Sequence, residues 1–141
     1  MDSRLNQSWW ALKIAFGVVP MVAGLDKFFN LLTNWEQYLS PLVARVIPAS
    51  TFMHAVGIIE IAAGLLVLSK LTRLGAYVVA AWLVGIALNL LGTGHYFDIA
   101  VRDLVMAVGA FTLARLSEVR APATEVDRRR TEVPRPARSH A

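Results

Sequence analysis

The 141-residue sequence contains no cysteine. The chain therefore forms no disulfide, offers no thiolate nucleophile and cannot ligate an iron–sulfur cluster through its own sulfur. It also has no glycine-rich phosphate loop, no His-Glu-x-x-His pair and no nucleophile elbow. These patterns assign no residue a catalytic role, and they leave open whether the protein is an enzyme.

Charge is scarce as well, since 17% of the residues are charged and 56% are hydrophobic. The apolar residues gather in four runs, at about residues 9–32, 51–69, 74–91 and 98–117. At about 1.5 Å per helical residue, such runs cross most of a hydrocarbon core of about 30 Å. We predict an all-α fold in which residues 1–117 form an integral membrane four-helix bundle.

Two segments fall outside these runs. Residues 33–50 carry apolar side chains at helical spacing between prolines, which predicts an amphipathic segment lying in the interface or folded as a lid over the bundle mouth. From Glu118 onward the sequence is polar and rich in arginine and proline. Residues 118–141 are therefore predicted to be a disordered cytoplasmic tail.

The positive charges predict the orientation of the bundle. Four spans place both termini on one side, together with Arg4, Lys13, Lys70, Arg73, Arg115, Arg120 and the tail arginines. The other side holds only Lys27, Arg45 and Arg102. By the positive-inside tendency, both termini are cytoplasmic and the chain is a multi-pass protein of the inner membrane. The basic tail is a retention and topology feature first and a contact for anionic lipid second, and no nucleic-acid partner is predicted.

One carboxylate, Glu60, lies well inside the second apolar run. An ionised carboxylate facing lipid costs on the order of several kcal/mol, so this side chain is expected to face protein or water. Gly57 and Gly64 share its helical face, where small residues allow another helix to approach. A segment around Gly17 and Gly24 repeats the same glycine spacing forty positions earlier, which suggests two related helix-pair units.

Most other polar residues of the bundle fall near its outer end, away from the termini. The candidate ligand-binding or proton-relay residues are Lys27, Glu60, Arg102, Asp103, Asp26 and Asn89. Arg102 is expected to pair with Asp98 or to reach Glu60 or Asp26, and Lys27 to reach Asp103. The pattern fits equally a purely structural ion-pair network and a network that also lines a ligand or proton site.

Two histidines, His54 and His95, are also expected at the outer mouth. Each is more simply interpreted as a hydrogen-bonded interfacial histidine. As a pair they are candidate ligands for haem or another metal, although no close metal-ligand spacing supports such a site.

Four short motifs carry a family resemblance. They are Gly17…Gly24-x-x-Lys27-Phe in the first run, Glu60-x-x-x-Gly64 in the second, Thr72-Arg73 before the third and Arg102-Asp103 opening the fourth. Together they resemble the DoxX-like family of four-helix membrane proteins, from about Trp9 to Leu116. The resemblance implies association with membrane redox systems, because members include the small subunit of thiosulfate:quinone oxidoreductase and companions of oxidative-stress enzymes. The matching polar positions are Lys27, Glu60, Arg102 and Asp103, while the absence of cysteine argues against direct sulfur chemistry.

Three functional hypotheses follow. The first is a small inner-membrane subunit of a quinone-linked redox system, whose polar cluster binds a small ligand or relays protons through Glu60. The second is a non-catalytic structural or assembly subunit of a larger membrane complex or of a homo-oligomer. The third is a small solute or proton transporter. Quinone is the first candidate cofactor and haem the second, and the lipid bilayer is the expected surrounding.

Overall fold

The computed structural model describes residues 2–132, without the side chains of residues 123 and 124. Over this range the chain is helical and contains no strand. The long helices are α1 (Ser3–Asp26), α3 (Ala49–Leu68), α4 (Thr72–Gly92) and α5 (Phe97–Glu132), and the short ones are η1 (Trp35–Tyr38) and α2 (Pro41–Ala44). The all-α prediction is confirmed.

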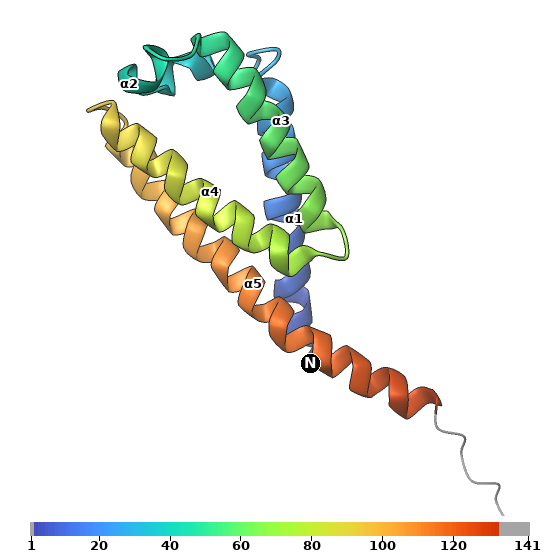
Figure 1. Ribbon diagram of the computed structural model, residues 1–141. Coiled ribbons are helices and arrows are strands. Elements are labelled where there is room, and N and C mark those ends of the chain that lie inside the picture. The colour runs from blue at the N-terminus through green and yellow to red at the C-terminus, as the bar shows by residue number, and fades with distance from the viewer. Residues whose placement is uncertain (1, 133–141) are drawn as a thin grey trace, which may run out of the picture.

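The long helices form two antiparallel pairs, α1 with α3 and α4 with α5 (Figure 1). The pairs meet at the lower end of the view, near the N-terminus and the α3–α4 turn, and diverge toward the upper end, where α2 lies. The core follows this arrangement. At the lower end a buried cluster joins all four helices through Trp9, Val67, Val79 and Leu113. At the upper end a second cluster, Ala87, Leu90 and Ala100, joins α4 to α5, and Tyr38 of η1 packs against it.

Glycines bring α1 and α3 into backbone contact. A Cβ atom added at Gly24 would lie 2.5 Å from the carbonyl oxygen of Gly57, and one at Gly57 would lie 2.6 Å from the carbonyl oxygen of Gly24. Gly64 meets the backbone of Gly17 in the same way. The repeated glycine motif therefore marks the two partners of one helix pair rather than two separate pairs. Larger residues there would hold the helices apart.

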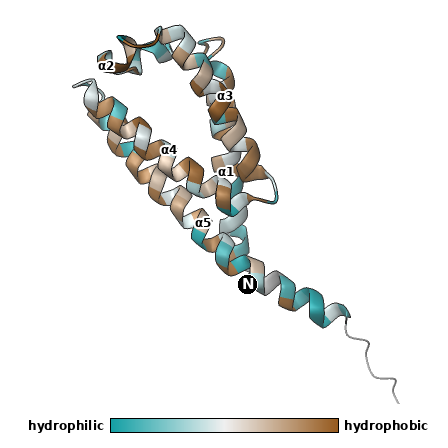
Figure 2. Cartoon of the chain, viewed as in Figure 1, coloured by the Kyte–Doolittle hydropathy of each residue, from teal (hydrophilic) through white to brown (hydrophobic). Residues whose placement is uncertain are grey.

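The outer surface of the bundle is apolar. Large side chains such as Val19, Ile58, Leu88 and Val105 are each 60% exposed or more. Figure 2 shows brown residues along the long helices and teal residues at the far end of α5. An apolar surface of this extent is typical of a protein surrounded by lipid. Three helices, α1, α3 and α4, are long and apolar enough to cross a membrane. The fourth, α5, is not among them, and three charged residues interrupt the apolar run near its start.

The first predicted run differs from the observed helix at both ends. Helix α1 begins earlier, at Ser3, because the carboxylate of Asp2 caps it by accepting the N–H of Arg4 at 3.0 Å. It ends earlier, at Asp26, whose carboxylate accepts the backbone N–H groups of residues 31 and 32 at 2.9 and 3.0 Å. Asn30 adopts a left-handed φ of 52° there, so the chain turns out of the helix.

The segment between α1 and α3 lies across the upper end of the bundle as two short helical pieces. The amphipathic helical spacing does not continue through it, because Pro41 and Pro48 start new elements. The side chain of Asn89 on α4 holds it in place, donating to the carbonyl of Tyr38 at 2.8 Å and accepting from the N–H of Ser40 at 3.0 Å. These contacts favour the lid interpretation over a segment lying apart in the interface.

The predicted disorder after residue 117 is wrong for residues 118–132, because α5 continues as one helix to Glu132. Ion pairs one helical turn apart support this exposed extension, Arg129 with Glu125 at 2.9 Å and Arg128 with Glu132 at 3.2 Å. The rest of the predicted tail, residues 133–141, lies outside the described residues.

Candidate functional site

A buried ion pair joins α1 to α3. The Nζ of Lys27, the residue directly after α1, lies 2.6 Å from Oε2 of Glu60, and the two side chains are 5% and 8% exposed. The contact between Gly24 and Gly57, one helical turn away from each partner, brings the two backbones close enough for this short pair. The interface between these two apolar helices therefore contains one pair of opposite charges.

Two tryptophans extend this pair to the lid and to the second helix pair. The Nζ of Lys27 lies 3.8 Å from the ring centre of Trp35 in η1, a cation–π contact. The indole N–H of Trp82 on α4 points to the other oxygen of Glu60, with Nε1 and Oε1 3.5 Å apart. Neither tryptophan was among the predicted site residues, because indoles in an apolar sequence are more simply interpreted as packing. The position of Trp35 in the predicted lid was the available signal.

Two further carboxylates are buried at this end of the bundle, and they differ in their partners. The carboxylate of Asp26 accepts three hydrogen bonds. One comes from the indole N–H of Trp35 at 2.8 Å, and two come from the backbone N–H groups that end α1. Asp103 on α5 is 7% exposed and makes no hydrogen bond or ion pair within residues 2–132. It lies near enough to Arg102 for the two opposite charges to attract, and near enough to Glu60 for the two like charges to repel. Among the buried members of this ion-pair group, Lys27, Glu60 and Asp103, two are acids and one is a base, and the exposed Arg102 supplies a second positive charge near Asp103.

The expected ion pairs of Arg102 are not formed within the described residues. Its side chain is exposed and forms no ion pair with Glu60, Asp26 or Asp98. Arg102 and its neighbour Asp103 are one residue apart on α5, which turns their side chains about 100° from each other, so only one can face the interior. Lys27 correspondingly binds Glu60 rather than Asp103.

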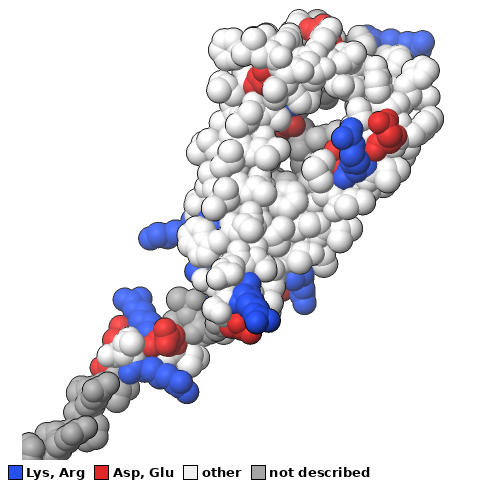
Figure 3. Space-filling view, turned by 180° about the vertical axis from the view of Figure 1, so that it is seen from behind, with Lys and Arg blue, Asp and Glu red and all other residues white. Residues whose placement is uncertain are grey.

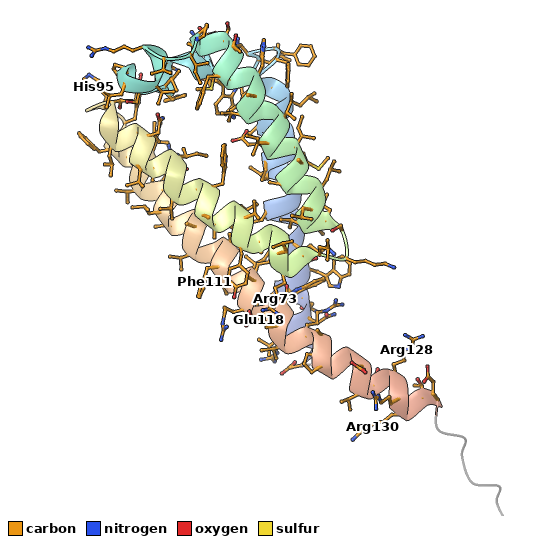
Figure 4. All side chains as sticks on the ribbon, viewed as in Figure 1. Arg73, His95, Phe111, Glu118, Arg128 and Arg130 are labelled. Atoms are coloured by element: carbon orange, nitrogen blue, oxygen red, sulfur yellow. The ribbon has the colours of Figure 1, made fainter. Side chains whose placement is uncertain are left out.

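The remaining candidates lie outside the ion-pair group. Asn89 holds the lid, as described above. His54 is exposed and stacks on Phe28 with ring centres 4.9 Å apart. His95 is exposed at the α4–α5 turn, at the upper tip of the molecule (Figure 4). Across the described part of the chain, no three His, Cys, Asp or Glu side chains gather in a way that would hold a metal ion.

The ion-pair group lies where the two helix pairs diverge. Its members Lys27 and Glu60 come from the α1–α3 pair, whereas Asp103 and the neighbouring Trp82 come from the α4–α5 pair. Figure 3, the view from behind, shows a hollow in the upper half of the molecule with charged side chains near its edge. Most of the remaining body is white, and the other charges lie toward its two ends.

The DoxX family profile matches residues 8–93, which is more than half of the chain. The chain belongs to the DoxX family. The matched part of this DoxX protein runs from α1 to α4 and contains Lys27, Trp35, Glu60 and Trp82, whereas Asp103 lies beyond it. No curated protein and no solved structure matches the chain significantly. Membership of the DoxX family and the three long apolar helices together indicate a membrane protein, which contacts lipid.

Proposed function

We propose that this DoxX-family protein is a small inner-membrane subunit of a quinone-linked redox system, whose buried group binds a polar head group and holds a proton. The observation that supports this most directly is Asp103, a residue only 7% exposed whose carboxylate accepts no hydrogen bond and forms no ion pair within residues 2–132. A carboxylate that has few hydrogen-bond donors in a low-dielectric surrounding is costly, so this position favours a ligand that donates a hydrogen bond.

The hydrogen-bonding groups suit both forms of a quinone head group. The ammonium of Lys27 and the indole of Trp82 are donors for a quinone carbonyl oxygen. The carboxylates of Asp103 and Glu60 accept from a quinol hydroxyl, and either can take the proton that the hydroxyl releases. Electrons enter or leave through a partner protein, in keeping with a subunit rather than a complete enzyme. The hollow in the upper half of the molecule (Figure 3) supports entry of the ligand from the bilayer.

The proposed topology has four spans, with α5 as the fourth and both termini cytoplasmic. Contacts that join the start of α1 to the middle of α5 support it. The indole N–H of Trp9 donates to the hydroxyl of Ser117 at 2.7 Å, and Nε of Arg120 donates to Asn6 at 3.1 Å. The α3–α4 turn with Lys70 and Arg73 lies at the same end, and its charges favour the cytoplasmic side.

Quinone binding to the purified protein tests the proposal. Decylubiquinone is titrated while tryptophan fluorescence is followed, since Trp35 and Trp82 flank the group, and quinone extracted from the untreated protein is measured by mass spectrometry. Asp103→Asn keeps the shape but removes the acid, and Arg45→Gln, an exposed charged position outside the group, is the matched control. Because a hydrogen bond to a charged group contributes about 1.5–3 kcal/mol, we expect Asp103→Asn to weaken binding by about tenfold or more.

Equal affinity in both variants, or no quinone binding by the wild type, would contradict the proposal. A protein that purifies only within a larger complex, and without quinone, would instead favour the structural or assembly role.

A further inference from the structure

A cleft of about 1140 Å³ opens at the lower end of the bundle, far from the ion-pair group. The start of α1, the α3–α4 turn and the second half of α5 line it. We propose that this cleft binds the phosphate head group of an anionic phospholipid. The inference rests on the charges, indoles and apolar surface around the cleft, and it does not depend on the proposed function.

The lining of the cleft is positively charged. Its cations are Lys13, Lys70, Arg73, Arg120, Arg128 and Arg129, and its acids are Glu118, Glu125 and Glu132. Each acid pairs with one arginine of the lining, and Figure 4 shows Arg73 beside Glu118. The two lysines, Lys13 and Lys70, make no ion pair within the described residues. The lining thus has the charge that complements a phosphate.

Lys13 is the residue best placed to bind the phosphate. Although it belongs to the first apolar helix and is only 9% exposed, this residue lines the cleft. It donates one hydrogen bond, to the carbonyl of Ser69 at 3.0 Å, and an ammonium has three donors. The guanidinium of Arg120 lies 3.8 Å from the ring centre of Trp9, and the Lys13 ammonium lies 4.9 Å from the same ring centre. An anion between these two cations would offset their mutual repulsion.

The surroundings favour a lipid over a soluble phosphate. Trp10 lies at the edge of the cleft, and tryptophan is enriched at the depth of lipid head groups. From Trp10, a stripe on α1 continues through Ile14 and Val18, at i+4 and i+8, and these side chains are 45%, 53% and 43% exposed. A phosphate held at Lys13 therefore places the acyl chains along an apolar stripe that runs into the bilayer. Anionic head groups bind in this way to basic pockets between membrane helices.

Retention of lipid in native mass spectrometry tests the site. The full-length protein is reconstituted in nanodiscs of phosphatidylcholine with an equal amount of phosphatidylglycerol, extracted in detergent, and the bound lipid is counted. Lys13→Gln removes the buried cation, and Lys70→Gln removes an exposed one whose loss disturbs no described contact. Arg45→Gln, an exposed cation on the segment across the upper end, is the matched control.

We expect the wild type and Arg45→Gln to retain phosphatidylglycerol in preference to phosphatidylcholine. Each lysine variant should retain about fivefold less, the factor that corresponds to about 1 kcal/mol per cation near a membrane surface. Equal retention in all four proteins would overturn the proposal. Loss of the bound lipid on addition of inorganic phosphate at millimolar concentration would also overturn it, by assigning the cleft to a soluble anion.

Discussion

Replacing Lys27 by methionine should reduce the free energy of unfolding by about 3–5 kcal/mol, the usual effect of breaking a buried ion pair. Methionine has a similar volume, so the change removes the ammonium and its contacts with Glu60 and Trp35 without leaving a large cavity. The 2.6 Å separation and the burial of both partners make the stability of the bundle sensitive to the loss of either charge.

The magnitude follows from three contributions. At 2.6 Å, two unit charges attract by about 6 kcal/mol if the effective dielectric constant is about 20. The cation–π contact with Trp35 adds up to about 2 kcal/mol when it is desolvated. The desolvation of the two ions opposes these contributions and costs several kcal/mol for each ion. The net contribution of the intact pair to stability is therefore small. In the variant, Glu60 keeps its desolvation cost but loses the attraction.

A double-mutant cycle in mixed micelles tests this reasoning, with unfolding by dodecyl sulfate followed by far-UV circular dichroism. Glu60→Leu alone should also destabilise, whereas Lys27→Met combined with Glu60→Leu should lie within about 2 kcal/mol of the wild type, because both desolvation costs are then removed. The control Arg45→Met should change stability by no more than about 0.5 kcal/mol. If the effects of the Lys27 and Glu60 replacements simply add, the two side chains do not interact and the reasoning is refuted.

Two further predictions concern packing and pH. Gly57→Ala should cost about 1–3 kcal/mol because its Cβ would meet the backbone of Gly24, whereas Gly85→Ala, which has open space around its Cβ, should stabilise by about 0.5–1 kcal/mol. Opposite signs in the same unfolding assay check this, and equal effects would contradict it. Glu118, outside the predicted spans, accepts a hydrogen bond from Tyr77 and pairs with two arginines, which hold its pKa below the ordinary value. Its contribution to stability is complete above the ordinary carboxyl pKa and is lost as the pH falls through the lower folded value, so the wild type and Glu118→Gln should converge in stability on acidification. A constant difference from pH 7 to about pH 3 would contradict it.

The elements of the fold were largely predictable because they depend on local sequence. Long apolar runs specify long helices whatever their neighbours are, and the prolines around the lid predicted interruptions there. The predicted helix ends were wrong where individual side chains, rather than a run of apolar residues, set the end of the helix. Asp26 ends α1 through its own carboxylate, and ion pairs one turn apart extend α5 beyond the apolar run.

The ionisable residues of the candidate site could be named from the sequence, but which of them pair with each other could not. Glu60 in an apolar run and Lys27 at the end of another were expected to find partners, and they bind each other. Arg102 was expected in the group as well, and it faces outward. Helical periodicity shows that Arg102 and Asp103 lie on different faces, but it does not show which of the two faces the interior.

The sequence by itself determined the helical content, the apolar surface and the presence of a few ionisable groups within the apolar runs, because these depend on composition and on spacing along one helix. Only the tertiary structure decided that Gly24 and Gly57 bring α1 and α3 into backbone contact, that Lys27 therefore reaches Glu60, and that Asp103 has no such partner. Those outcomes depend on how neighbouring helices are rotated and how closely they approach, and packing between helices sets both.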